Sequence, residues 1–293
     1  MTQGQGMNAK ILAGAAGALI ATAVAIPPAL ASEGYFSNGY GAVNKSMAGA
    51  GVAAGFDSMS QAINPASLAL VDSDFTIDIS ALNQSRSYEV IGDPSGADGA
   101  FGLEAGSFDS ERNYFYLPSI GNAWEIDDSS SWGWALYSNG RMNTSWDLPE
   151  AGVFSSGKTG ADLAQAFLQF TYAQEMSPEV YLGISPIIAA QRFKAWGLDG
   201  LADMSSDPDS LSNEGYDTSY GYGVKVGIQA EIGAGFSFGA AYQTEMFMTS
   251  FSKYSGLLAN NGEFNIPATL QTGLAWQADS GFIVALDYKR IYY

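Results

Sequence analysis

The sequence contains no cysteine and no histidine, and only 12 of its 293 residues are lysine or arginine. Without cysteine and histidine there is no disulfide framework, no Cys/His metal site and no histidine-based catalytic triad. The 30 aspartate and glutamate residues bring the formal net charge to -18. Because nucleic acid is bound by clustered Lys and Arg, this charge excludes it as a partner. We expect no cofactor, no metal and no enzymatic activity.

Long apolar runs are also scarce. Residues 1–31 have the layout of a secretory signal peptide, with Lys10, an uncharged run over residues 11–26 and small residues at Ala29 and Ala31. That run of 16 residues is shorter than the ~20 residues of a spanning helix. A retained N-terminal anchor is the alternative. Any later membrane-spanning part must be a β-barrel.

What the sequence does have is alternation of apolar and polar residues, which is typical of β-strands. In residues 220–232 the apolar set runs from Tyr220 to Ile232 at every second position, against Gly, Gln, Lys225 and Glu231. The segment 161–175 fits a strand, although residues 161–172 also have helical spacing. About nine strands are expected, over residues 74–89, 113–126, 131–141, 161–175, 179–192, 220–232, 236–248, 264–277 and 281–292.

The connections between these strands alternate between short turns and long loops, as in outer-membrane barrels. Short turns are expected near residues 127–130, 176–178, 233–235 and 278–280. Aromatic residues at strand ends fit the interfacial girdles of a barrel, among them Trp132, Trp134, Tyr220, Tyr222, Trp276, Tyr288 and Tyr292. A secreted β-sandwich also alternates, but here large aromatics occupy the apolar face along its whole length. The pattern favours the barrel.

Residues 32–71 carry neither strand pattern nor many charges. They are rich in Gly, Ala and Ser and end in Asn64-Pro65-Ala66. Asn is a good helix N-cap and Pro suits the first helical position, so a short capped turn is expected from Asn64. Small residues allow backbones to approach closely, which suits a compact plug.

Two other patterns suggest chemistry that their context does not support. Residues 152–159 match the phosphate-binding pattern G-x-x-x-x-G-K-[ST], ending at Lys158 and Thr159, but a loop precedes them where a buried strand is required. The acidic residues between Asp199 and Asp217 could bind divalent cations, although their spacing fits no EF-hand. A solvated acidic loop is the simpler interpretation, and it could share cations with lipopolysaccharide.

Basic residues are rare on the polar face of the predicted strands, where Arg141 and Lys225 are the main examples. In a lumen such a cation usually pairs with an acid, and Glu231 or Glu245 could serve Lys225. The functional alternative is that Arg or Lys holds a carboxylate-bearing ligand. Arg141→Ala would then lower fatty-acid uptake more than uptake of a neutral aromatic compound.

Several segments together resemble the FadL/TodX family of outer-membrane transporters for hydrophobic compounds. They are the Gly/Ala-rich segment that ends in Asn64-Pro65-Ala66-Ser67-Leu68, the strand Trp132 to Thr144, the Ser185-Pro186 to Phe193 strand, and residues 253–257 leading to 264–268. The resemblance implies an all-β fold, a transmembrane antiparallel β-barrel of about 14 strands with an N-terminal hatch plugging the lumen. With about nine strands in residues 72–293, we expect a C-terminally truncated member with an incomplete barrel.

The resemblance also implies functional roles for particular residues. Asn64, Pro65 and Ala66 would belong to the hatch, and Ser138, Asn139 and Gly140 would lie near a lateral opening in the wall. Candidate ligand-binding residues are Arg141, Phe193, Trp196, Leu198, Leu201, Leu257 and Leu258. The implied activity is passive transport of long-chain fatty acids or aromatic hydrocarbons by a monomer in the outer membrane, with lipid and lipopolysaccharide as neighbours. A structural or adhesive barrel is the alternative, and an outer-membrane lipase is disfavoured because the chain has no histidine.

Overall fold

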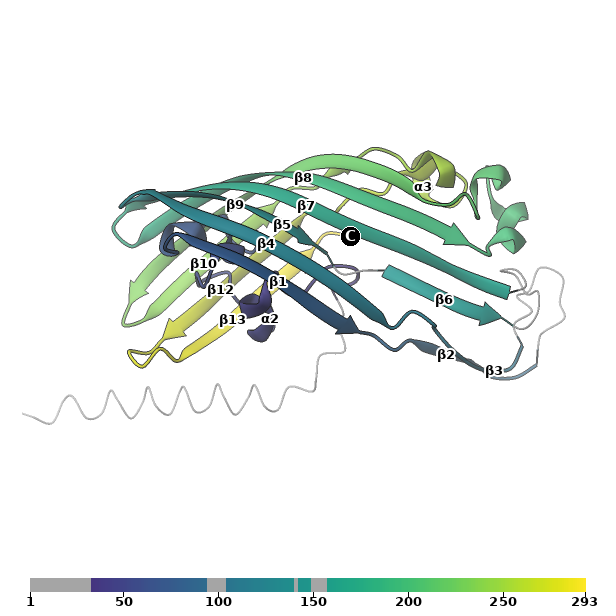
Figure 1. The fold of residues 1–293 in the computed structure, drawn as a ribbon, viewed down its shortest axis with the longest axis horizontal. Coiled ribbons are helices and arrows are strands. Elements are labelled where there is room, and N and C mark those ends of the chain that lie inside the picture. Colours follow the sequence, from purple (N-terminus) through teal and green to yellow (C-terminus); the bar gives the residue numbers. More distant parts are fainter. Residues whose placement is uncertain (1–32, 94–103, 140–141, 149–156) are drawn as a thin grey trace, which may run out of the picture. The chain divides into compact units, whose positions relative to one another are not determined.

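The structure is a computed structural model that describes residues 33–93, 104–139, 142–148 and 157–293. The predicted signal peptide, Gly140, Arg141 and most of the G-x-x-x-x-G-K-[ST] match lie outside these residues. Residues Tyr35–Tyr293 form one compact unit, which consists of a curled antiparallel sheet and an N-terminal segment, residues 35–71 (Figure 1). In the described ranges no helix is long and apolar enough to cross a membrane.

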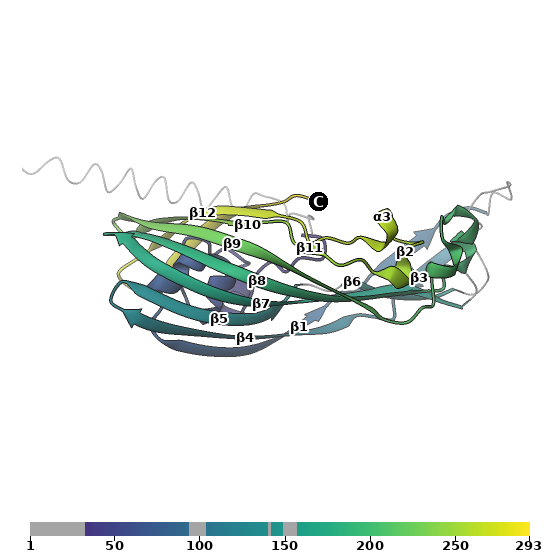
Figure 2. The same cartoon turned by 90° about the horizontal axis from the view of Figure 1, so that it is seen from above.

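Nine strands form the main path of the sheet, each hydrogen-bonded to the next in sequence order. They are β1 (Asp74–Asn83), β4 (Tyr114–Asp127), β5 (Ser130–Ser138), β7 (Gly157–Ser177), β8 (Val180–Trp196), β9 (Asp217–Gly233), β10 (Phe236–Gln243), β12 (Thr269–Gln277) and β13 (Ile283–Ile291). These nine match the predicted strands, and the strand interpretation of residues 161–175 is confirmed by β7. The sheet curls into a half-barrel (Figures 1 and 2).

Four further strands lie off this path. β6 (Met142–Leu148) pairs with β7, β11 (Phe247–Met248) pairs with β9, and β2 (Ser87–Val90) pairs with β3 (Gly106–Asp109) in a separate two-stranded sheet. The predicted strand over residues 74–89 is therefore two strands. Residues 264–268 precede β12 instead of belonging to it, and only Ile266 among them forms a bridge, to Met246.

The turns follow the predicted alternation. Two residues separate β4 from β5, β7 from β8 and β9 from β10. The opposite end carries the long connections, with the short helices η3 (Asp199–Met204), η4 (Pro208–Ser210), η5 (Ser252–Tyr254) and α3 (Ala259–Gly262). Since outer-membrane barrels have short periplasmic turns and long outer loops, the second end is the extracellular one.

The sheet is apolar outside and polar inside, the reverse of a soluble protein. On the outward face Ile184 is 49% exposed and Tyr222 is 74% exposed, whereas the inward side chains of Ser185, Lys225 and Gln229 are at most 5% exposed. The Trp124 and Trp132 rings stack 4.4 Å apart beside the β4–β5 turn. A continuous apolar exterior with aromatic ends is what a bilayer requires.

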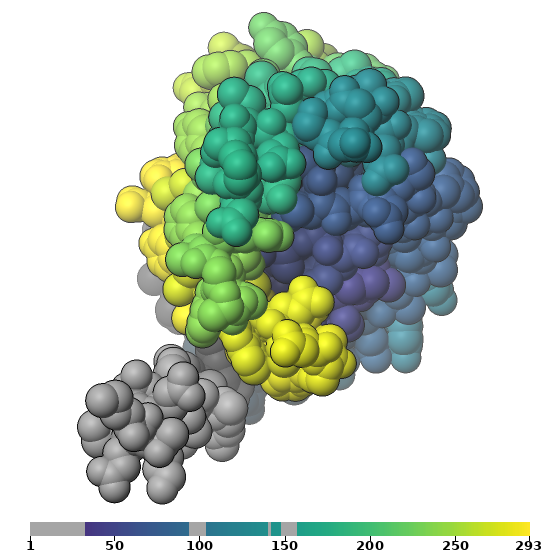
Figure 3. Space-filling model, turned by 90° about the vertical axis from the view of Figure 1, so that its left-hand side faces the viewer, coloured from purple at the N-terminus to yellow at the C-terminus, as the bar shows by residue number. Residues whose placement is uncertain are grey.

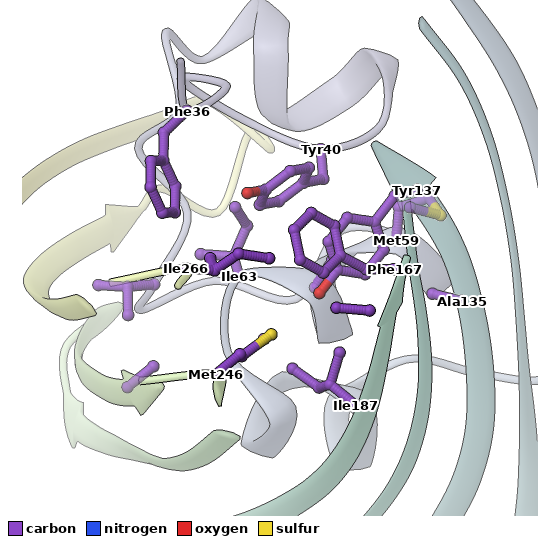
Figure 4. Packing of buried hydrophobic residues seen from close by; sticks show 14 of the residues in the cluster. Phe36, Tyr40, Met59, Ile63, Ala135, Tyr137, Phe167, Ile187, Met246 and Ile266 are labelled. Carbon is purple, nitrogen blue, oxygen red and sulfur yellow. The ribbon is translucent and has the colours of Figure 1, made fainter. Parts of the chain in front are cut away.

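The N-terminal segment fills the concave side of the sheet. It contains α2 (Ala42–Ser46), η1 (Ser58–Ala62) and η2 (Pro65–Leu70), and Figure 3 shows it inside the curve of the strands. Phe36, Tyr40, Met59 and Ile63 pack against wall side chains such as Tyr137, Phe167 and Ile187 (Figure 4). The main core therefore lies between the segment and the wall.

The predicted alternation of outward and inward side chains fails in one predicted strand, residues 236–248. Gln243 pairs with Lys225, but Phe247 pairs with Tyr222, so one extra residue enters the chain between them. Such an irregularity moves the following side chains to the other face. Met246, which alternation places outside, is fully buried in the core.

Candidate functional site

The site begins with the way Asn64 fixes the N-terminal segment to the wall. Its side-chain oxygen accepts from the backbone N–H of Ala66 at 3.1 Å, as expected for an N-cap. Its amide nitrogen donates to the carbonyls of Val52 at 2.7 Å and Ile228 at 3.0 Å. The expected capped turn is confirmed as the 3-10 helix η2, with Pro65 at its first position. One buried side chain thus joins two parts of the segment to β9.

Close contact here depends on two inward-facing glycines, Gly183 and Gly227, which are partners in the β8–β9 ladder. A Cβ at Gly183 would overlap the Pro65 backbone, and one at Gly227 would overlap the Asn64 side-chain oxygen. Because glycine has no side chain, the N-terminal segment contacts the wall directly at these two positions.

Lys225 also contacts the segment, although not in the predicted way. Its ammonium donates to the carbonyl of Ala62 at 2.5 Å and lies 5.9 Å from the centre of the Tyr40 ring. Among the described residues no carboxylate lies within ion-pair distance of it. The expected ion pair of Lys225 with Glu231 or Glu245 is therefore wrong. The Lys225 ammonium donates instead to a backbone carbonyl of the N-terminal segment.

Among the described residues, the strand pairing along β7 has a break between β5 and β6. The β5–β7 ladder ends at Ser138 opposite Ala166, and the β6–β7 ladder starts at Met142 opposite Leu163. In the described ranges, Ala164 and Gln165 of β7 have no strand partner on that side. Ser138 and Asn139 thus lie at this break, while Gly140 and Arg141 are outside the described residues.

A pocket of about 570 Å³ opens at the break. Side chains of the outward face line it, including Ile120, Leu136 and Ala166, and so do inward-facing residues, including Tyr137, Gln165 and Gln191. We call it the wall pocket. Residues of both faces of the sheet therefore contribute to its lining.

A chain of buried hydrogen bonds crosses the inner side of the wall pocket. The Tyr40 hydroxyl donates to Asn139 at 2.6 Å, Asn139 donates to Gln165 at 2.9 Å, and Gln165 donates to Gln191 at 2.9 Å. Gln191 in turn donates to the backbone carbonyl of Phe264 at 2.7 Å. This amide ladder connects the N-terminal segment, the wall break and an extracellular loop.

The candidate ligand-binding residues that the structure describes divide into two groups. Phe193 packs in a loop cluster with Phe251 and Tyr254 at ring distances of 5.7 and 4.9 Å, and Leu198, Leu257 and Leu258 pack against this cluster. Trp196 instead contacts Lys194, whose ammonium lies 4.9 Å from its ring centre. Leu201 lies in η3 and is not part of the cluster.

Sequence reasoning missed Tyr137, Gln165 and Gln191. The signal was present, because glutamines recur on the polar face of neighbouring strands, at Gln165, Gln169, Gln191 and Gln229. Their mutual contacts depend on strand register, which alternation alone does not define. Among the described residues no group of acidic side chains is placed to hold a metal ion.

An apolar exterior, a polar interior and an N-terminal segment packed on the concave side of the sheet define the wall of a membrane β-barrel. The chain belongs to the family of outer membrane protein transport proteins (OMPP1/FadL/TodX), which it matches over residues 22–293. It is accordingly a protein of the outer membrane of Gram-negative bacteria. No curated protein matches the sequence.

Solved structures agree on the fold. The toluene transporter TbuX of Ralstonia pickettii superposes with a TM-score of 0.63 at 15% identity, covering 87% of this chain and 72% of that one. The toluene transporter TodX of Pseudomonas putida gives 0.61 at 16% identity, with 89% and 72% covered. A FadL homologue of Pseudomonas aeruginosa gives 0.56 at 17% identity, with 87% and 69% covered.

Proposed function

We propose that the chain is a passive transporter that admits hydrophobic compounds through the outer membrane and releases them sideways into the bilayer. The wall pocket carries this proposal, because residues of both the inward and the outward face line it. An apolar solute is more stable in the bilayer than in water, so an exit through the wall suits it better than an exit through an aqueous channel. The proposal involves no catalytic residue and no cofactor.

The proposed path has three stages. A hydrophobic compound first binds at the loop cluster around Phe193, Phe251 and Tyr254. It then enters the lumen as the N-terminal segment moves away as a hatch, and leaves through the wall pocket. The supporting contacts are those of the amide ladder, which ties Tyr40 of the segment to Asn139 at the break and reaches the loop at Phe264 through Gln191.

The proposed substrates are long-chain fatty acids or aromatic hydrocarbons. Transport of toluene is named for TodX and TbuX, and the wall pocket is lined largely by aliphatic and small side chains such as Ile77, Ile120 and Ala190. Both observations support a compound with a substantial apolar body.

The test is uptake by cells that lack other transporters of this kind. Ser138→Trp places a large ring at the wall pocket and is expected to reduce uptake of labelled oleate or toluene at least fivefold. Ala81→Trp is the control, since Ala81 lies on the outward face of β1 but does not line the pocket. If neither compound is taken up by the unaltered protein, the alternative of a structural or adhesive barrel is favoured. If Ser138→Trp transports normally, the sideways exit is wrong.

A further inference from the structure

The outer side of the wall pocket is a groove with a floor of small residues. The strand registers place Ser138, Ala166, Ala190 and Tyr220 in one row across β5, β7, β8 and β9. Ala164 and Arg192 are partners in the next row toward the extracellular end. All of these residues line the wall pocket. The outer surface therefore has a groove along Ala164, Ala166 and Ala190, and this groove ends at the guanidinium group of Arg192.

Arg192 is accompanied by a second cation. Lys194 follows two residues later on the same face of β8, and both side chains contact the Tyr216 ring. The Arg192 guanidinium carbon and the Lys194 ammonium each lie 4.6 Å from the ring centre. The aromatic ring holds both charges in fixed positions at the end of the groove.

One acidic side chain lies beside this pair and accepts a hydrogen bond through one of its oxygens. Asp162, the strand partner of Lys194, is 5% exposed and accepts the Tyr216 hydroxyl at 2.7 Å. Burial is the main cause of the raised pKa of Tyr216, and the hydrogen bond to Asp162 adds to it, while Arg192 and Arg112 oppose it. Among the described residues neither Arg192 nor Lys194 has a carboxylate oxygen within 4.0 Å.

Along the bilayer normal, Arg192 and Lys194 lie at the level where the apolar layer of a bilayer ends. The outward apolar positions of β8 run from Leu182 to Ala190, eight residue steps or about 27 Å along the strand, and about 21 Å along the bilayer normal at a tilt of about 40°. Arg192 is one pleat further toward the extracellular end. The apolar band of outer-membrane barrels is about 25 Å tall, so Arg192 and Lys194 lie where lipid headgroups begin.

We propose that this groove binds a phosphorylated lipid of the outer leaflet. Its phosphate would bind Arg192, with Lys194 alongside, since the planar guanidinium pairs with phosphate through two parallel hydrogen bonds. An acyl chain would lie over Ala164, Ala166 and Ala190, where larger side chains would exclude it. Charge complementarity supports this occupant, because two cations that face a single buried carboxylate, Asp162, stand together at the membrane edge of a chain with a net charge of -18.

The test compares lipid binding by the protein purified from outer membranes and stripped of lipid. The probe is hexa-acylated, bis-phosphorylated lipid A, and native mass spectrometry measures the fraction of protein that carries it. The double variant Arg192→Gln/Lys194→Gln is expected to bind the probe at least fivefold more weakly than the unaltered protein. Lipid A without phosphates should bind both proteins equally and weakly.

Two further variants distinguish the contribution of the two cations from that of the small residues on the floor of the groove. Ala166→Leu/Ala190→Leu fills the floor and leaves both cations, and it is expected to weaken binding of the phosphorylated probe at least threefold. Arg290→Gln is the matched control, because Arg290 is also an exposed cation beside an aromatic ring, 4.8 Å from the centre of Tyr292, but lies on β13. It should bind like the unaltered protein.

Three results would overturn the proposal. The first is equal binding of lipid A by the double variant and the unaltered protein. The second is an equal loss in Arg290→Gln, which would indicate a general effect of charge. The third is Arg192-dependent binding of palmitate without Arg192-dependent binding of lipid A, which would assign the groove to a departing carboxylate ligand.

Discussion

The side chain of Asn64 has both its oxygen and its nitrogen hydrogen-bonded, and it is fully buried. Asn64→Ala removes three hydrogen bonds and the N-cap of η2, leaving the carbonyls of Val52 and Ile228 without this donor. We expect a loss of about 1–3 kcal/mol in the free energy of unfolding. Urea unfolding in lipid vesicles measures it. Asn83→Ala is the control, since Asn83 is exposed at the end of β1, and an equal loss there would contradict the assigned role.

Gln165 occupies the middle of the amide ladder, at 3% exposure. Gln165→Leu keeps the approximate volume but leaves Asn139 and Gln191 each without one partner. Each buried group that loses its partner costs about 1–3 kcal/mol, so the temperature at which the purified barrel loses its heat-resistant gel mobility should fall. Gln174→Leu, near the periplasmic turn of the same strand, should change it much less. An unchanged temperature for Gln165→Leu would mean that the ladder does not stabilise the wall.

At the scale of elements, the contact between η2 and the β8–β9 pair depends on Gly227. Gly227→Ala places a methyl group against Asn64, and the N-terminal segment must shift. Lys45 is the only lysine or arginine in residues 35–71 and donates to Ser80 of β1 at 2.7 Å. We therefore expect faster tryptic cleavage after Lys45 in this variant.

Gly223→Ala is the matched control for this experiment. Gly223 faces inward on the same strand, but the atoms nearest to its added methyl group belong to Met246 and Thr244 and not to the N-terminal segment. Cleavage after Lys45 should stay slow in this control. Equal rates in the two variants would show that Gly227 does not position the segment.

Alternation predicted the nine strands of the main path because each of them separates a bilayer from a polar interior. It missed β3 and β6 and did not separate β11 from the strand predicted over residues 236–248, because there the partner strand and not the local pattern determines the structure. The inward burial of Met246 was missed because one extra residue reverses the faces. Asn64 was found through its local capping signal, whereas the contact of Gln165 with Gln191 spans 26 residues and needs the strand register.

At the scale of the whole molecule, the outward face has to be in contact with lipid. Val226 lies on that face of β9, 44% exposed and opposite Ile184 of β8, near the middle of the apolar band. Val226→Arg is expected to lower the free energy of unfolding in vesicles by about 2–4 kcal/mol. Ile232→Arg, on the same face beside the periplasmic turn, should cost about 0–1 kcal/mol. Equal effects would contradict the membrane orientation.

The central claim is that a hydrophobic compound crosses only when the N-terminal segment leaves its place against the wall. The measurement is uptake by Lys45→Cys/Ser80→Cys, in which a short reducible crosslinker joins the segment to β1. The chain has no other cysteine, so each single-cysteine variant treated with the same reagent is the control. We predict that crosslinking abolishes oleate or toluene uptake and that a reductant restores it. Uptake that continues unchanged in the crosslinked protein would contradict the account.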